Sequence, residues 1–175
     1  IVDKEEIGSS GSTGLESNYL EYFMADIINK VNGEYNEINL KKTLWNSKAL
    51  SADVNDAINP MFKEVHDSLN AAKLGYGIVV TKYTGSGGKY SSNDADAEFV
   101  HEIRTLLNKN NITWQIGMLG KVDEGGGGTV AKYLANFGIR TIDVGPALLA
   151  MHSPFELASK FDIYETYRSY KVFYK

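Results

Sequence analysis

The 175-residue sequence predicts an α/β protein in which helices cover both faces of a mostly parallel sheet, a three-layer α/β/α arrangement. Three observations lead to this class. Short β-branched apolar runs alternate along the chain with stretches of helical period. Glycine-rich segments separate the two kinds of element. The length suits one domain with a substantial core.

The first half of the chain contains one strong helical pattern and one strong strand pattern. In order, the sequence predicts a loop at 10–14, a helix at 15–31, a short strand at 49–54, an irregular segment at 55–70 and a strand at 77–83. The helix has an inner stripe and ends at Asn32-Gly33. The stripe consists of Leu20, Phe23, Met24, Ile27, Ile28 and Val31.

The second half continues the alternation. It predicts a flexible loop at 84–88, a helix from about Asp94, a strand at 113–119, a four-glycine loop at 125–128, a helix at 129–137, a strand at 139–144 and a last helix from about Ser153. Ser153 followed by Pro154 matches an N-cap and a favoured first helical residue. The glycine loop lacks the Lys-Ser/Thr pair of a phosphate-binding loop. We expect it to line a substrate cleft, the alternative being a flexible connector.

Composition excludes several classes of function. The net charge of −4 and the lack of a Lys/Arg cluster argue against a nucleic-acid partner. No apolar run approaches the length of a transmembrane helix, so no membrane partner is expected. Cysteine is absent, so any metal must be held by oxygen and imidazole, and a cytoplasmic location is expected. Because the chain opens on Ile1-Val2 without methionine, we expect it to be the carboxyl-terminal part of a longer protein.

Two adjacent carboxylates, Glu5 and Glu6, follow the apolar pair Ile1-Val2 and precede a Gly/Ser-rich turn. In α/β proteins, catalytic groups occur at the carboxyl ends of core strands. Side chains that leave a strand diverge, so one carboxylate can hold a metal while the other faces an attacking water as a general base. The alternative is an ordinary solvated pair at the end of a strand.

Asp53 and His152 also follow predicted strands. Parallel strands end at the same sheet edge, so Glu6, Asp53 and His152 are expected to converge there. Two carboxylates and one imidazole suit Zn²⁺, Mn²⁺ or Co²⁺. The alternative for His152 is a packed histidine at a helix start, and His66 and His101 have no comparable placement.

Five motifs occur in order over essentially the whole chain. They are Asp-Lys-Glu-Glu-Ile-Gly-Ser at 3–9, Ser-Ala-Asp-Val at 51–54, Thr-Lys-Tyr-Thr-Gly-Ser at 81–86, Lys-Val-Asp with four glycines at 121–128, and Met-His-Ser-Pro-Phe-Glu at 151–156. Together they resemble the aspartyl aminopeptidase and aminopeptidase I family of metallopeptidases, and look closer to the bacterial and vacuolar aminopeptidase I branch. The resemblance implies a zinc-exopeptidase-like fold. It makes residues 1–175 the carboxyl-terminal part of a catalytic domain, without the amino-terminal part and an inserted oligomerisation domain.

The resemblance also implies a site with two divalent metals, usually zinc. By it, Glu5 is the general base, Glu6 and His152 bind one metal, and Asp53 binds the other. Two further family ligands, a His in a His-x-Asp motif and a bridging Asp, lie upstream of the Glu pair and are not in this chain.

Substrate and assembly are implied in the same way. Peptides are the expected substrates, with Lys82 and Tyr90 in the segment that helps form the substrate pocket. A homo-oligomer is expected, since the family commonly forms dodecamers. The leading hypothesis is a metalloaminopeptidase. The alternatives are an inactive α/β binding or assembly module and a related dinuclear hydrolase that acts on other amide bonds. The retained Glu5, Glu6, Asp53 and His152 argue against an inactive module.

Overall fold

A computed structural model describes all of residues 1–175, and the chain divides into two compact units. Unit 1 comprises Ile1–Ala49 and Val130–Thr141, and unit 2 comprises Leu50–Thr129 and Ile142–Lys175. Unit 1 has one hydrophobic cluster of buried residues and unit 2 has two. No helix is both long enough and apolar enough to cross a membrane.

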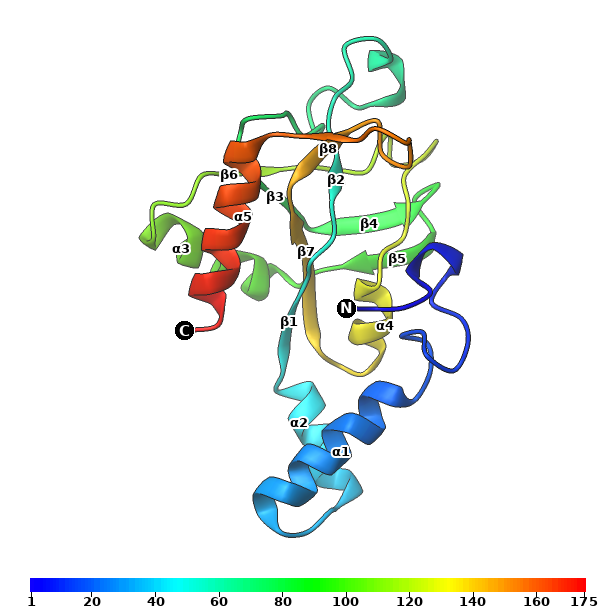
Figure 1. The fold of residues 1–175 in the computed structure, drawn as a ribbon, viewed down its shortest axis with the longest axis vertical. Helices are drawn as coiled ribbons and strands as arrows, with labels where there is room; N and C mark the ends of the chain where they lie inside the picture. The colour runs from blue at the N-terminus through cyan, green and yellow to red at the C-terminus, as the bar shows by residue number, and fades with distance from the viewer. The chain divides into compact units, whose positions relative to one another are not determined.

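Unit 1 is built around a helical hairpin. Its elements are η1 (Glu5–Ile7), a 3₁₀ turn, α1 (Tyr19–Asn32), α2 (Glu37–Trp45) and α4 (Ala131–Asn136). Figure 1 shows α1 and α2 side by side, joined by a short loop. Ile28, Leu40, Leu44 and Ile139 form the core. Helix α2 was not predicted, because its two buried leucines stand among polar neighbours and make a weak helical pattern. The Asn36 side chain caps the start of α2 by accepting a hydrogen bond from Ile38 N (2.8 Å).

Helix α1 ends at Gly33, which has a left-handed φ of 76°, as predicted. Its apolar stripe differs from the prediction. Ile28 is buried and Leu20 and Met24 pack on the core, but Phe23 is 52% exposed and Val31 77% exposed. Apolar residues therefore lie on both faces of this helix, and only one face is needed for the core of unit 1.

The central sheet has the strand order β1-β7-β3-β6. These strands are β1 (Lys48–Ser51), β7 (Arg140–Gly145), β3 (Ile78–Thr81) and β6 (Trp114–Ile116). Strand β3 pairs in parallel with β6, and antiparallel with β7. The predicted α/β class with a mostly parallel central sheet is confirmed, although the β3–β7 pairing is antiparallel.

Helices α3 (Ala97–Lys109) and α5 (Lys160–Phe173) pack on one face of β3. Successive strand residues point to opposite faces, so Ile78 and Val80 face these helices while Val79 faces away. Val79 packs against Ala57, Ala72 and Ala147. The small alanine side chains let backbone approach this side of the strand closely.

Two buried carboxylates attach α5 to the segments that lead into the sheet. Asp162 accepts hydrogen bonds from the backbone N–H groups of Gly75 and Gly77, each at 2.7 Å. Glu165 accepts one from Thr113 N at 2.6 Å. Gly77 directly precedes β3, and Thr113 directly precedes β6. The last helix therefore holds the starts of two adjacent strands.

The prediction that the last helix begins near Ser153 is wrong, since α5 begins at Lys160. The Ser153 hydroxyl accepts from Phe155 N (3.1 Å), which makes a local turn instead of a cap. The chain then enters β9 (Leu157–Ala158), which pairs with β8 (Ala147–Leu149). Strands β8 and β9 form a small sheet with β2 (Asn55–Asp56). Within the predicted irregular segment lies one short 3₁₀ turn, η2 (Lys63–Val65).

The predicted flexible loop at 84–88 is largely a β-hairpin. Strand β4 (Tyr83–Ser86) pairs antiparallel with β5 (Tyr90–Asp94). Gly87 and Gly88 both have positive φ, 54° and 70°, and make the turn. The glycines here serve a tight reversal, which is why a glycine-rich sequence forms ordered structure.

Candidate metal and catalytic site

Glu5 and Glu6 lie in η1 of unit 1. The prediction that they leave a strand is wrong: Ile1 and Val2 are exposed, and the segment makes only an isolated bridge between Asp3 and Gly14. A strand needs a neighbour to pair with, and these residues have none in this chain. Consecutive residues of a 3₁₀ turn point about 120° apart, so Glu5 and Glu6 still face different directions. Glu5 is half-buried and Glu6 exposed.

The loop around η1 is held by several contacts. Lys4 and Gly8, which flank η1, are both left-handed, with φ of 65° and 79°. The Thr13 hydroxyl donates to Asp3 Oδ2 (2.7 Å), and this hydrogen bond lowers the pKa of the Asp3 carboxyl. The Tyr133 hydroxyl donates to the Gly8 carbonyl at 2.6 Å, which ties the loop to α4. The glutamate pair thus stands on an anchored loop.

Asp53 lies two residues beyond β1, as predicted, and belongs to unit 2. Its Oδ1 accepts a hydrogen bond from Val54 N at 2.8 Å. The chain then enters β2, where Asn55 N donates to the Pro146 carbonyl (2.9 Å). Asp53 is partly buried, so its carboxylate is placed by its own turn and by the strand that follows.

His152 lies three residues beyond β8, also in unit 2, so its predicted position after a strand is confirmed. Ala150 and His152 have left-handed φ values of 58° and 65°. A non-glycine residue in this region signals backbone held by its surroundings. Glu156 supplies part of that restraint by accepting a hydrogen bond from His152 N at 2.7 Å.

The four predicted residues are divided over the two units, Glu5 and Glu6 in one and Asp53 and His152 in the other. No group of three or more His, Asp or Glu side chains in residues 1–175 is arranged to hold a metal ion. The donor set of carboxylate oxygen and imidazole nitrogen suits zinc. The convergence of Glu6, Asp53 and His152 stays a prediction.

The two predicted substrate contacts lie in and beside the β4–β5 hairpin. Lys82 pairs across it with Asp94, and both side chains are about half exposed. Tyr90 begins β5 and is 78% exposed. Lys82 therefore has an anionic partner within the chain, whereas the Tyr90 ring lies open on the surface.

The four-glycine loop is bound to strand β4. Gly85 N donates to Gly127 O (2.9 Å) and Gly87 N donates to Gly125 O (2.8 Å), a spacing of two residues as in a β-ladder. A β-carbon at Gly128 would lie 2.2 Å from the Ser91 side chain. The close approach that requires glycine is made to the hairpin, and the lining of a substrate cleft by this loop stays a prediction.

Two further groups with long-range partners were missed. Tyr170 of α5 donates its hydroxyl to the Val144 carbonyl (2.5 Å). Burial raises the pKa of Tyr170 to about 12, and the negative charge of Asp53 adds to the rise. His66 is buried, with Nε2 2.8 Å from Asp56 Oδ2. No local pattern predicts these pairs, because their members are distant in sequence.

Solved structures identify the class of fold. An M18-family aminopeptidase from Thermotoga maritima matches with a TM-score of 0.93 and 50% identity, over 98% of this chain and 38% of that one. The mApe1 dodecamer of S. cerevisiae matches with a TM-score of 0.76 and 25% identity, over 99% of this chain and 36% of that one. The chain has the α/β fold of these aminopeptidases.

Sequence comparison assigns the family. Residues 1–174 match the family model described as Aminopeptidase I zinc metalloprotease (M18), and the chain belongs to this family. The probable M18 family aminopeptidase 1 of Borrelia garinii subsp. bavariensis is 65% identical over 176 residues, covering 100% of this chain. The chain spans 38% of the length of that relative.

Proposed function

We propose that the whole protein is a metalloaminopeptidase that removes the amino-terminal residue from peptides. One observation carries the proposal: the chain belongs to the M18 family over residues 1–174 and retains Glu5, Glu6, Asp53 and His152 in its motifs. Hydrogen bonds of Asp3 and Gly8, which flank the glutamate pair, and of His152 N support it. They restrain the loop that carries Glu5 and Glu6 and the backbone at His152.

In this proposal Glu6 and His152 hold one zinc ion and Asp53 the other, with two further ligands from the segment that precedes the Glu pair in the family. When bound, the ions polarise the scissile carbonyl and favour ionisation of the attacking water. Glu5 accepts the proton of that water and passes it to the leaving amine. The half-buried position of Glu5 in η1 supports a role as base.

Substrate contacts and assembly belong to the same proposal. Tyr90 offers an exposed ring to a bound peptide. Lys82 contributes indirectly, because its ion pair with Asp94 stabilises the β4–β5 hairpin that carries Tyr90. We propose a homo-oligomer, for which the dodecameric S. cerevisiae structure is the support. A cytoplasmic location, proposed from the absence of cysteine, completes the assignment.

The test uses the full coding sequence, with zinc content by elemental analysis beside turnover of leucyl and alanyl peptides. Glu5→Gln should lower turnover by about 10²–10⁴-fold while leaving the zinc content unchanged, because it removes a base and no ligand. His152→Ala should lower both zinc content and turnover. The matched control is His101→Ala, since His101 is an exposed histidine of α3.

Two outcomes would overturn the proposal. Loss of zinc in Glu5→Gln with retention in His152→Ala would reverse the assigned roles. A wild-type protein that binds zinc but cleaves no peptide would favour the inactive α/β module.

A further inference from the structure

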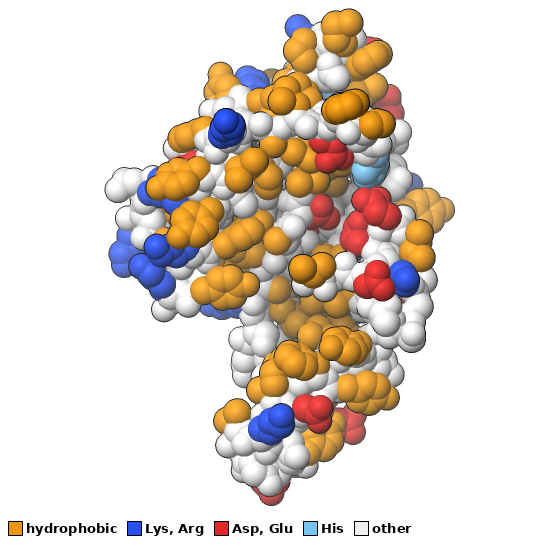
Figure 2. Space-filling view, viewed as in Figure 1, with side chains coloured by type: hydrophobic (Ala, Val, Ile, Leu, Met, Phe, Trp, Pro, Cys, Tyr) orange, Lys and Arg blue, Asp and Glu red, His pale blue; other side chains and the backbone are white.

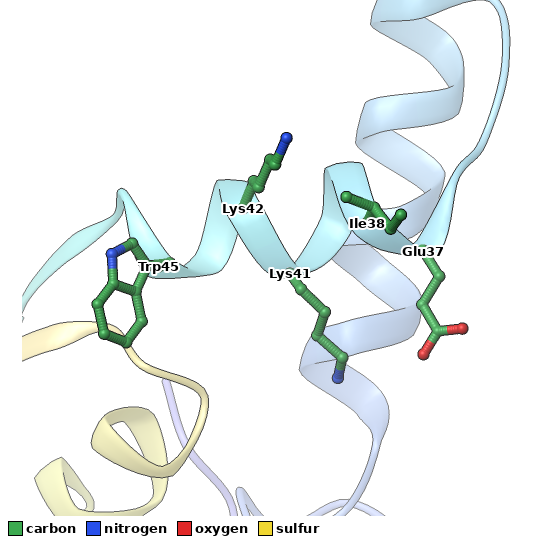
Figure 3. A pocket seen from close by; sticks show the side chains of 5 residues that line it. All are labelled: Glu37, Ile38, Lys41, Lys42 and Trp45. Carbon is green, nitrogen blue, oxygen red and sulfur yellow. The ribbon is translucent and has the colours of Figure 1, made fainter.

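The exposed surface of α1 and α2 selects no ligand by its chemistry. Figure 2 shows hydrophobic side chains over these helices with Lys and Asp or Glu side chains among them, and Tyr19, Tyr22 and Phe23 of α1 are exposed. The groove on α2, of about 420 Å³, is lined by Glu37, Ile38, Lys41, Lys42 and Trp45 (Figure 3). Charges of both signs line this groove, so it favours neither an anionic nor a cationic partner. Unit 2 offers a more definite feature, a hydrogen bond between two buried side chains.

This buried hydrogen bond joins the strand that follows Asp53 to the central sheet. The Asn55 side chain donates from Nδ2 to Thr81 Oγ1 at 2.7 Å. Asn55 belongs to β2 and is 2% exposed, and Thr81 ends β3 and is 3% exposed. A hydrogen bond in such a low-dielectric interior is stronger than one in water. It therefore restrains two segments that are 26 positions apart in the sequence.

The polar side chain of Asn55 is costly at this position. Asn55 pairs with Ala147 across the β2–β8 ladder, and Ala57, Val79 and Ala147 belong to one apolar cluster. Asn55 Oδ1 is buried and accepts no hydrogen bond from the chain. Apolar side chains of the same shape at positions 55 and 81 would avoid this loss of stability. A residue that breaks the local apolar pattern is expected where function requires it.

The packing at Gly117 accommodates the Asn55 side chain. A β-carbon at position 117 would lie 2.9 Å from Asn55 Oδ1 and 2.5 Å from Val79 Cγ1. Gly117 directly follows β6, which pairs in parallel with β3. The Asn55 side chain thus lies against the ends of two adjacent strands of the central sheet.

Three hydrogen bonds restrain the short segment that begins at Asp53. Val54 N donates to Asp53 Oδ1 at 2.8 Å, within the turn itself. Asn55 N donates to the Pro146 carbonyl at 2.9 Å, just beyond the end of β7. Only the third, from the Asn55 side chain to Thr81, reaches β3. The segment is therefore held between the end of β7 and the end of β3.

We propose that Asn55 is a positioning residue for the metal ligand Asp53, with the Thr81 hydroxyl as its support. The inference rests on the proposed function, in which Asp53 binds one of the two zinc ions. Asn55 acts through Asp53, because it fixes the backbone two residues beyond the ligand. Outer contacts that orient a metal ligand typically change metal affinity about 10–100-fold when they are removed.

The effect should fall on one ion more than on the other. In the proposed function the second ion is held by Glu6 and His152. Glu6 lies in unit 1, and the backbone at His152 has a restraint of its own, the hydrogen bond from His152 N to Glu156. Neither of these two ligands depends on Thr81 through a direct hydrogen bond. Loss of the Asn55–Thr81 contact should therefore separate the affinities of the two ions.

The first experiment titrates zinc into the full-coding-sequence protein in competition with a chelator. Thr81→Val removes the hydroxyl and should weaken one of the two zinc ions at least about tenfold, while the other stays within about twofold of wild type. Thr81→Ser keeps the hydroxyl and should restore the affinity. Rescue by serine would not be expected if position 81 served packing alone.

The second experiment removes the other partner. Asn55→Ala should weaken the same ion to the same degree, and the Asn55→Ala/Thr81→Val double variant should be no weaker than the single ones, because both remove one shared hydrogen bond. The matched control is Asp162→Asn, which loses a buried hydrogen bond of α5 and should keep both ions. This control separates a loss of orientation at Asp53 from a general loss of stability.

Every other result counts against the positioning role. Wild-type affinity for both ions in Thr81→Val or Asn55→Ala would show that Asp53 is placed without this contact. Equal weakening of both ions, a Thr81→Ser variant as weak as Thr81→Val, or failure of both single variants to fold would show that the hydrogen bond serves stability alone. A wild-type protein that binds fewer than two zinc ions would contradict the proposed function itself, which keeps the two failures distinct.

Discussion

Gly145 packs against the backbone of Asp53 so closely that a β-carbon at position 145 would stand 1.8 Å from the Asp53 carbonyl oxygen. Gly145 is the last residue of β7, and the next residue, Pro146, accepts a hydrogen bond from Asn55 N through its carbonyl. The proposed metal ligand Asp53 is thus placed by the end of a strand more than 90 residues away in sequence. The approach is possible only because position 145 has no side chain.

Gly145→Ala should move Asp53 and loosen metal binding. The methyl group must displace backbone, which costs about 1–3 kcal/mol in a tightly packed site. In the full-coding-sequence protein we expect reduced zinc content and a lower free energy of unfolding in urea. Gly127→Ala is the control, since nothing lies within 4 Å of a β-carbon there. Unchanged zinc content and stability in Gly145→Ala would show that Asp53 is positioned by other contacts.

Asp162→Asn should destabilise the protein without touching the proposed site. Asp162 accepts from two buried N–H groups through separate oxygens, and an amide can offer only one oxygen. The N–H group left unpaired costs about 1–3 kcal/mol. Urea unfolding, compared with Glu98→Gln on exposed α3 surface, measures the loss. Equal stability of the two variants would refute the anchoring role of α5.

The raised pKa of Tyr170 predicts that the free energy of unfolding falls at alkaline pH. Its pKa is raised from 10.0 to about 12 in the folded protein, so the unfolded chain ionises first as pH rises. The stabilisation is complete below pH 10 and is lost between about pH 10 and 12, by up to about 2 kcal/mol for this partly exposed group.

The matching variant is Tyr170→Phe. It loses the hydrogen bond to the Val144 carbonyl, which costs about 0.5–1.5 kcal/mol at neutral pH. Its unfolding free energy should fall less steeply than that of wild type between pH 10 and 12. Parallel pH profiles for the two proteins would contradict the assignment.

The proposed aminopeptidase should prefer neutral or apolar amino-terminal residues to acidic ones. A pocket for an aspartyl side chain needs a cation to pair with the buried carboxylate. Lys82 is engaged with Asp94, and the exposed Tyr90 offers an apolar wall. Rates on leucyl, alanyl, aspartyl and glutamyl substrates decide the matter. A clear preference for the acidic pair would point to Lys82 or Lys89 as the carboxylate partner.

Much of the fold could be predicted because its signals are local. The β-branched run at 78–81 is β3, and the apolar period after Asp96 is α3. Predictions failed where local patterns have more than one structural use. Ser153-Pro154 forms a turn instead of a helix start, and the glycines after Tyr83 form a hairpin instead of a flexible loop.

The sequence by itself determined the α/β class, the positions of Asp53 and His152 after strands, and the family of the chain. These depend on periodicity and on residue order, which each short segment carries within it. Only the tertiary structure decided that Gly145 abuts Asp53, that Asp162 and Glu165 hold the starts of two strands, and that α1 leaves an aromatic face exposed. Such contacts join residues tens of positions apart, so no local sequence pattern specifies them. Whether a side chain is buried likewise depends on residues that are distant in sequence.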